Sequence, residues 1–279
     1  MLSYRSRGEA EMKRLSQERS YFVAKDNQLI TKSRYSLSMA QQKILLYFIS
    51  RIKPYDDENT LYEFKIKDFI QVCGYYDDTS YYYTQIKKDI KELADASSWI
   101  EIEKGKEVLF RWINEAEIEK NNGVIRISFH KTVIKYLFDL RDRYTQYSLY
   151  NVLCLSHKYS IRLYEYLRMM EYRGEFQITI EELKRRIDAE KYSAISNFTA
   201  RVLDPAIEDI NDHTDLFVWY EFQKTDRRIT HITFYYGDKS SFDMSITGKR
   251  QERKINPLKR LESKKKIAQA KEELQKSKE

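Results

Sequence analysis

The feature that most constrains the fold is one continuous passage, a helix followed directly by a hairpin, between residues 198 and 236. Its first part, FTARVLDPAIEDIN, carries apolar residues at helical spacing. Its second part, TDLFVWYEFQKTDRRITHITFYY, contains two alternating runs that flank a polar, basic turn at residues 224–228. The passage therefore predicts a helix packed on a two-stranded hairpin with a cationic tip.

The same unit occurs earlier in the chain, which indicates an internal duplication. A helical stripe starts at Tyr83, and two strand-like runs follow it, one on each side of Lys104-Gly105-Lys106. We predict an α+β fold of two tandem winged-helix domains related by this duplication, each with a recognition helix for a DNA groove and a wing for phosphate. By pattern, Ile86, Ile90, Leu93 and Trp99 match Leu203, Ile207, Ile210 and Leu216.

The pattern divides the chain into four parts. Residues 1–24 are expected to be a loosely ordered N-terminal arm, and residues 25–146 the first winged-helix domain with a helical connector at its end. Residues 147–240 are the second winged-helix domain, and residues 241–279 a basic tail that is helix-prone or disordered.

Several local signals refine these domains. Ser38 and Ser156 are the expected N-caps of the first main helix in each domain. Asn121-Asn122-Gly123 predicts a hairpin turn that adds strands to the first domain. Pro205 lies inside the second recognition helix, where it either kinks the helix or starts a new segment capped by Asp204; we favour the kink because the apolar stripe stays in phase across it.

Charge and cysteine content limit the classes of protein. The segment 248–279 holds 12 Lys or Arg and five Asp or Glu, which leaves 38 of each sign in residues 1–247. Any affinity of the folded body for nucleic acid must therefore come from local asymmetry of charge. Cys73 and Cys154 lack metal-ligand spacing, so we expect core thiols and no metal or cofactor. No apolar run reaches membrane-spanning length and no signal peptide is evident, so we expect a cytoplasmic protein without membrane contact.

The candidate DNA contacts lie on the two recognition helices and the two wing tips. On the second helix, Asn197 and Arg201 face away from the apolar stripe, where they could pair with adenine and guanine edges. Phosphate contacts are expected from the wing cations. The second-domain candidates are Lys191, Tyr192, Ser193, Ser196, Asn197, Arg201, Lys224, Arg227 and Arg228, and the first-domain candidates are Tyr81, Gln85, Lys88, Lys104 and Lys106. Singly, each of these could belong to an ordinary solvated face.

With these residues in view, the chain resembles plasmid replication initiators that bind iterons, the directly repeated sites of a plasmid origin, through tandem winged helices. The resemblance covers residues 25–238 and is carried by three passages: NQLITKSRYSLSMAQQKILLYFIS, SIRLYEYLR and the block 198–236. It implies theta-type replication, binding of double-stranded iteron DNA, opening of an adjacent AT-rich segment and recruitment of the host replicative helicase or its loader. It further implies a homodimer formed through the first domain, which often represses its own gene and takes part in copy control. For that dimer, Trp112, Ile125 and Ile127 on the first-domain strands are candidates that could instead be core residues.

The sequence offers no catalytic motif. The four histidines, His130, His157, His213 and His231, are isolated, so the paired histidines of a DNA-nicking initiator are absent, and there is no phosphate-binding loop of the GxxxxGK[ST] kind. We predict no catalytic residues. The competing hypothesis is a winged-helix transcriptional repressor without an initiation role, because a fold alone does not determine function.

Overall fold

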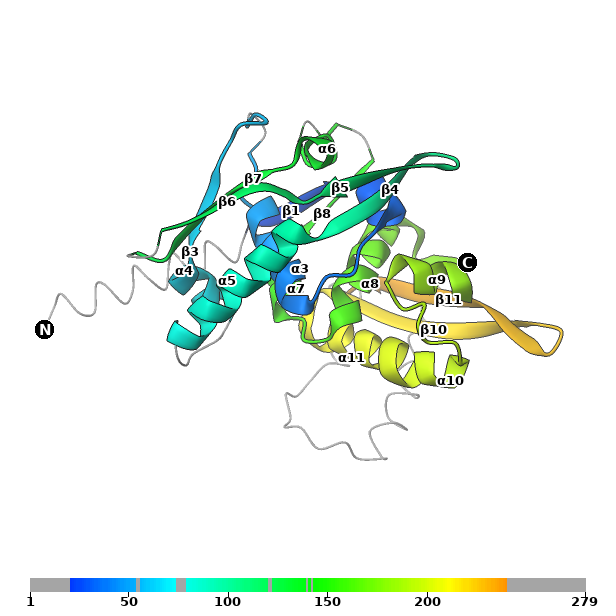
Figure 1. Cartoon of the computed structure of the whole chain (residues 1–279). Helices are drawn as coiled ribbons and strands as arrows, with labels where there is room; N and C mark the ends of the chain where they lie inside the picture. Colours follow the sequence, from blue (N-terminus) through cyan, green and yellow to red (C-terminus); the bar gives the residue numbers. More distant parts are fainter. Residues whose placement is uncertain are drawn as a thin grey trace, which may run out of the picture.

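The computed structural model describes residues 21–53, 56–73, 79–119, 122–138, 140–141 and 143–239 (Figure 1). Most of the predicted N-terminal arm and the whole predicted tail, residues 1–20 and 241–279, lie outside these residues. The prediction of an arm is wrong for residues 22–24, which belong to strand β1 Phe22–Asp26, where Val23 is fully buried. Such a short strand with two buried positions leaves little periodic signal in a sequence.

The first domain contains the predicted alternation of helices and strands. Ser38 caps α3 as predicted, in a capping box in which its hydroxyl accepts from the Gln41 amide. The candidate recognition helix α5 begins at Thr79 and contains the predicted stripe that starts at Tyr83. The elements are β1, α2 Asn27–Lys32, β2 Ser33–Arg34, α3 Met39–Ile49, β3 Tyr62–Lys65, α4 Ile66–Val72, α5 Thr79–Asp95, β4 Ser97–Glu103, β5 Lys106–Arg111, β6 Ile113–Glu119, β7 Val124–Phe129 and α6 Lys131–Ile134.

The second domain repeats the order of elements but begins differently from the prediction. Its first long helix, α8, starts at Lys158 with His157 in the N-cap position, so Ser156 is not the N-cap. Asp209 is the reason, because its carboxylate accepts both the amide and the hydroxyl of Ser156. The elements are β8 Tyr144–Ser148, α7 Leu149–Cys154, α8 Lys158–Met169, η1 Glu171–Arg173, β9 Glu175–Thr179, α9 Ile180–Arg186, α10 Ile195–Phe198, η2 Thr199–Leu203, α11 Asp204–His213, β10 Leu216–Thr225 and β11 Arg228–Asp238.

The two domains pair their strands differently. In the second domain, β9 pairs with β11 of the wing, which gives the sheet order β10-β11-β9. In the first domain, the wing strands form a sheet of order β2-β4-β5, and β3 pairs instead with β7, in a sheet of order β3-β7-β6. The hairpin β6–β7 turns at Gly123 with a φ of 64°, as predicted. This hairpin therefore takes the place beside β3 that the wing occupies in the second domain.

The predicted connector helix after β7 is largely wrong. Of the described residues in the predicted connector, 130–144, α6 alone is helical, and Tyr144 at its end begins β8, which pairs antiparallel with β1. Thr145 and Tyr147 of β8 are buried. Their partner strand lies at the other end of the first domain, so no local pattern in the sequence could identify the pairing.

Burial tests the predicted match between the two domains. Ile86, Ile90 and Leu93 are buried, as are their partners on the second recognition helix. Trp99 is 48% exposed, whereas its predicted partner Leu216 is fully buried, so that part of the match is wrong. The neighbouring Ile100 is buried, which shows that the strand register differs by one residue.

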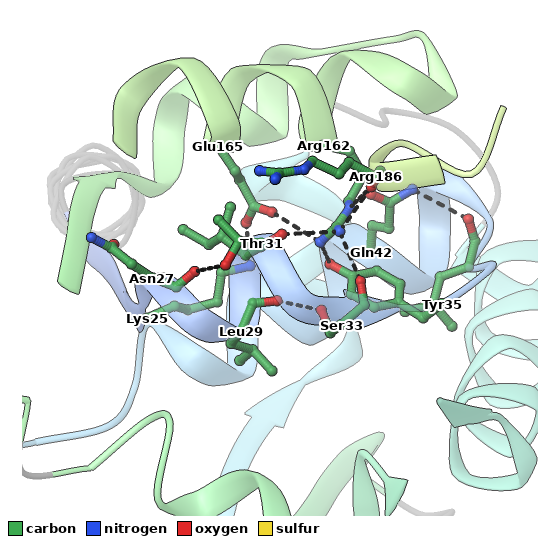
Figure 2. A network of polar contacts seen from close by, with 12 residues as sticks. Lys25, Asn27, Leu29, Thr31, Ser33, Tyr35, Gln42, Arg162, Glu165 and Arg186 are labelled. Carbon is green, nitrogen blue, oxygen red and sulfur yellow. Dashed lines mark hydrogen bonds and ion pairs between the residues drawn. The ribbon is translucent and has the colours of Figure 1, made fainter. Parts of the chain in front are cut away.

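Buried apolar residues of both domains form a single core, and polar groups cross the junction. Helix α3 packs against α7 and α8. Figure 2 shows Arg162 of α8 reaching across to the segment that carries Ser33 and Tyr35. The buried Arg162 guanidinium donates to the carbonyls of Ile30 and Ser33, both at 3.3 Å, and to the Arg186 carbonyl of α9 at 3.0 Å. This junction fixes the start of the first domain against the helices of the second.

Candidate nucleic-acid interface

The second recognition helix is one continuous helical run formed by α10, η2 and α11. Its predicted stripe is buried, including Phe198 and Val202, and it packs against α8 and β10. Asn197 and Arg201 are exposed on the opposite side, as predicted from their spacing. The structure thus leaves both side chains free to meet a ligand outside the protein.

The middle of this helix is wider than an α-helix. The amide of Asp204 donates to the carbonyl of Thr199, five residues earlier, which defines a π-turn over η2. Leu203 and Asp204 both have helical backbone angles, and no side chain caps α11. The helical run therefore continues from η2 into α11 without a break, and Asp204 does not act as the cap of a new segment. The π-turn lies immediately before Pro205, whose ring would crowd the carbonyl four residues back in a regular helix.

Ser156 and His157, which directly precede α8, donate hydrogen bonds to a buried carboxylate of this helix. Asp209 of α11 accepts the amides of Ser156 and His157, each at 2.9 Å, together with the Ser156 hydroxyl. Burial raises the pKa of Asp209, but hydrogen bonds from Ser160, His157 and Ser156 outweigh it and lower the pKa overall. Burial lowers the pKa of His157, against the opposing effects of Asp209 and of a hydrogen bond to the backbone of Arg201.

The segment that leads into the second recognition helix is also anchored. Lys191, Ser193 and Ser196 are exposed. Tyr192 is half-buried and packs edge-on against Tyr159, with the two ring centres 6.2 Å apart. Lys184 of α9 donates to the Ser193 carbonyl at 3.3 Å and lies 5.2 Å from the Phe198 ring centre. The sequence predicts Tyr192 as a DNA contact. In the structure, part of its ring packs against Tyr159 and is not available to a ligand.

The second wing carries its cations at the tip of a long hairpin. Lys224, Arg227 and Arg228 are exposed, and no hydrogen bond or ion pair recorded for the described part of the chain involves their side chains. Asp226 turns the chain with a φ of 57°, a conformation that Asp tolerates better than most residues. Figure 1 shows the β10–β11 hairpin projecting beyond the helices around it.

The exposed face of the first recognition helix holds two lysines besides the predicted Lys88. Tyr81 is 62% exposed, and Lys88 forms an exposed ion pair with Glu92 at 3.8 Å. Gln85 is half-buried and donates to Asp89 at 3.2 Å. Lys87 and Lys91 are exposed on the same face as Lys88, and helical spacing from the buried Ile86 and Ile90 would have identified them.

The first wing is shorter but has the same kind of tip. Lys104 and Lys106 are exposed on either side of Gly105, whose φ of 78° makes the tight turn. The strands behind them pair from Ser97 with Arg111 to Glu103 with Lys106. Each domain therefore presents a helix and a cationic hairpin tip, as the sequence predicts.

The predicted dimer residues are not on the surface. Trp112, Ile125 and Ile127 are each fully buried in the first-domain core. Trp112 packs edge-on against Tyr35 and Phe110, with ring centres 5.0 and 5.1 Å apart. The prediction that these three side chains form a surface for a second copy is wrong, because each of them is packed inside the first-domain core.

Other kinds of site find little support in the described residues. Within the described ranges, no group of three or more His, Cys, Asp or Glu side chains could hold a metal ion. Cys73 and Cys154 form no disulfide bond and are half-buried. Among the helices described, none is long and apolar enough to span a membrane.

Comparisons with known proteins agree with the two-domain arrangement. A family model described as "Initiator Replication protein, WH1" matches residues 22–168, and one described as "Initiator Rep protein, WH2" matches residues 179–236. A solved structure of Pi initiator protein in complex with iteron DNA aligns with a TM-score of 0.68 at 20% identity, over 79% of this chain and 99% of that one. An uncharacterized 27.6 kDa protein of Escherichia coli is 26% identical over 229 residues, which cover 75% of this chain and 93% of the relative.

Proposed function

The chain belongs to the winged-helix family of replication initiator proteins, and from that premise we propose that it initiates plasmid replication by binding directly repeated origin sites with both winged helices. The solved relative in the same fold is a complex with iteron DNA, which supports this choice of ligand. Two recognition helices in one chain suit a site longer than a single groove contact, because each helix can enter its own major-groove segment.

The distribution of charge along the second recognition helix favours entry of its N-terminal half into the major groove. Asn197 and Arg201 are exposed there, beyond the exposed Lys191. Farther along, Asp204, Glu208 and Asp212 are exposed and carry the same sign of charge as phosphate. A DNA backbone would therefore be repelled from the C-terminal half and attracted to the N-terminal half.

The observation that carries the proposal is the convergence of exposed polar groups on one helix and the adjacent wing. Asn197 and Arg201 offer groups that can read base edges, whereas Lys224, Arg227 and Arg228 offer exposed positive charges suited to phosphate. The first domain adds Lys87, Lys88 and Lys91 with its own wing, which would extend the contact along the duplex.

The test is a pair of substitutions with opposite signatures. Arg201→Ala should weaken binding to the preferred duplex by about 1–3 kcal/mol and relax one base position, with little change on random DNA. Lys224→Ala should weaken binding to all duplexes alike and reduce the slope of log K against log salt by about 1.

The assay is fluorescence anisotropy on a preferred duplex, found by footprinting the DNA around the gene, and on a random duplex of equal length. Lys131→Ala is the matched control, since this exposed lysine begins α6, on the other side of the molecule from α10 and α11 (Figure 1). Equal binding of the wild-type protein to both duplexes would overturn the proposal. Several direct repeats beside an AT-rich tract favour the initiator, whereas a lone inverted repeat at the promoter favours the repressor.

The resemblance to initiators supports three further parts of the proposal. The protein opens an AT-rich segment next to its sites, recruits the host replicative helicase or its loader, and performs no catalysis of its own. It acts in the cytoplasm, where the plasmid is. Permanganate reactivity of thymines in the AT-rich segment, measured with and without the protein, tests the opening step, and a lack of protein-dependent reactivity would contradict it.

We also propose that a homodimer forms through strands of the first domain and limits copy number. The buried dimer candidates cannot supply the contact, but β6 lies at the edge of the β3-β7-β6 sheet with Glu115, Ala116 and Glu117 exposed. An edge strand offers backbone groups to a second copy. Light scattering across a concentration series tests this, and a strictly monomeric protein at high concentration would refute it.

A further inference from the structure

Arg162 lies where the two domains meet and forms hydrogen bonds to both of them through one buried side chain, which is 6% exposed. Toward the first domain, its guanidinium donates to the Ile30 and Ser33 carbonyls, each at 3.3 Å, and to the Tyr35 hydroxyl at 2.6 Å. Toward the second domain, it donates to the Arg186 carbonyl at 3.0 Å (Figure 2). A guanidinium holds its donors in one rigid plane, so this side chain connects the two domains in a defined geometry.

The first-domain end of this connection leads to the first recognition helix and its wing. Ser33 belongs to β2 and pairs with Ile100 of β4, which is a strand of the first wing. Strand β4 begins at Ser97, and the recognition helix α5 ends just before it at Asp95. A displacement of β2 would therefore move β4, and with it both the wing and the end of α5.

The second-domain end of the connection leads to the second recognition helix. Arg186 is the last residue of α9, and residues 187–194 join α9 to α10. The amide of Ala189 donates to the Lys184 carbonyl at 2.7 Å, and the Lys184 side chain donates to the Ser193 carbonyl at 3.3 Å. The joining segment is thus held to α9 near both of its ends, so the position of α9 determines where α10 begins.

Lys158 makes a second connection of the same kind, one helical turn earlier on α8. Its ammonium forms an ion pair with Asp188 at 2.8 Å and donates to the Ser36 hydroxyl at 3.5 Å. Two cations of α8 therefore connect the same two stretches of chain, residues 30–36 of the first domain and residues 186–188 of the second.

We propose that Arg162, supported by Lys158, is a positioning residue that fixes the two recognition helices relative to each other and so determines the spacing between the two DNA segments that the protein accepts. The inference rests on the proposed function, and it requires neither residue to contact DNA. In a B-form duplex, each added base pair moves the second segment by about 3.4 Å and turns it by about 35°. Two rigidly connected helices cannot follow this change, whereas two loosely connected helices can.

The experiment measures how much an insertion of two base pairs between the two contact segments weakens binding. The starting duplex is one that the full-length wild-type protein selects from a random pool. Footprints of Arg201→Ala and Lys87→Ala on this duplex mark the segments that the second and the first recognition helix contact. The insertion should weaken wild-type binding by about 10- to 30-fold, because only one helix can then bind in register.

Arg162→Lys keeps the positive charge but loses the planar set of donors that reaches carbonyls on both sides of the junction. Its binding to the unmodified duplex should fall by about 3- to 10-fold, because the two helices are no longer preorganised. The insertion should then weaken its binding by only about 3-fold further. The control Lys131→Ala should show the wild-type loss on insertion.

Circular dichroism shows whether Arg162→Lys is folded. If it is not, Lys158→Ala decides, because the Lys158 side chain is 34% exposed and its removal leaves the buried guanidinium in place. The loss on insertion must then be at least about 2-fold smaller for Lys158→Ala than for the wild-type protein, and an equal loss would refute the inference.

The outcomes separate the inference from the proposed function. If the wild-type protein selects no sequence, the proposed function fails. If the wild-type protein selects a sequence but loses less than about 2-fold on insertion, the function stands and the role of Arg162 is refuted. A folded Arg162→Lys protein with the wild-type loss on insertion would also refute it. So would one that no longer distinguishes selected from random duplexes, because Arg162 would then be needed by the recognition helices themselves and not by their spacing.

Discussion

Lys25→Met should strongly destabilise the protein by removing a buried charge at the domain junction. Lys25 of β1 forms an ion pair with Glu165 of α8, and the two side chains are 2% and 0% exposed (Figure 2). The Tyr147 hydroxyl donates to the same carboxylate oxygen, and Arg162 lies 3.9 Å from the other oxygen. Burial, followed by the charge of Glu165, raises the pKa of Tyr147, so this phenol remains a donor at neutral pH.

The expected loss of stability depends on which partners Glu165 still has after Lys25 is replaced. Removing one member of a buried ion pair costs about 3–5 kcal/mol, because the other charge stays buried without compensation. Here Tyr147 and the more distant Arg162 remain, so we expect a loss of about 3 kcal/mol, the low end of that range. Adding Glu165→Gln to Lys25→Met should recover about half of the loss, since a neutral amide is cheaper to bury than a carboxylate.

The assay is urea unfolding followed by far-ultraviolet circular dichroism, with the free energy of unfolding extrapolated to water. Lys131→Met is the control, because this exposed lysine should change stability by no more than about 0.5 kcal/mol. A loss below about 1 kcal/mol for Lys25→Met would refute the reasoning, since it would mean that removing Lys25 does not leave a costly buried carboxylate. A double variant less stable than Lys25→Met would refute the assignment of the cost to the buried carboxylate.

Three further perturbations test other parts of the structure. Burial lowers the pKa of His157 in the folded protein, whereas in the unfolded chain the pKa is about 6.5. The stability that His157 contributes is therefore complete above about pH 6.5 and is lost as the pH falls through the folded-state pKa. Urea titrations between about pH 7 and 5 should therefore show a decline that His157→Gln flattens, and an unchanged slope would contradict the assignment. Gly174→Ala should cost about 1 kcal/mol in the same assay, because Gly174 has a φ of 66°; a neutral effect would show that the backbone can relax there. Joint replacement of Lys87 and Lys91 by Ala should reduce the salt slope of DNA binding by about 2, measured against Lys131→Ala, and an unchanged slope would remove the first recognition helix from the phosphate contacts.

Residues close together in the chain were predictable wherever one local rule decided the outcome. The apolar stripe of each recognition helix, the capping box at Ser38 and the turn at Gly123 all depend on neighbours within a few positions, and all three are confirmed. The exposure of Arg201 and of the wing tips follows from the same periodicity, since positions opposite a buried stripe face outward. Sequence reasoning therefore located the recognition helices and the wings.

Only the tertiary structure decided which distant segments meet. Strand β8 was not predicted because its partner β1 is far away in the chain, and the buried Trp112 packs against Tyr35, which is distant in sequence. Pro205 was visible in the sequence, but the amides of Ser156 and His157 that donate to Asp209 in the same helix come from a segment about 50 residues earlier. Local periodicity determines which face of a helix or strand is apolar, whereas contacts between elements far apart in sequence depend on how those faces pack together, and no local pattern records that packing.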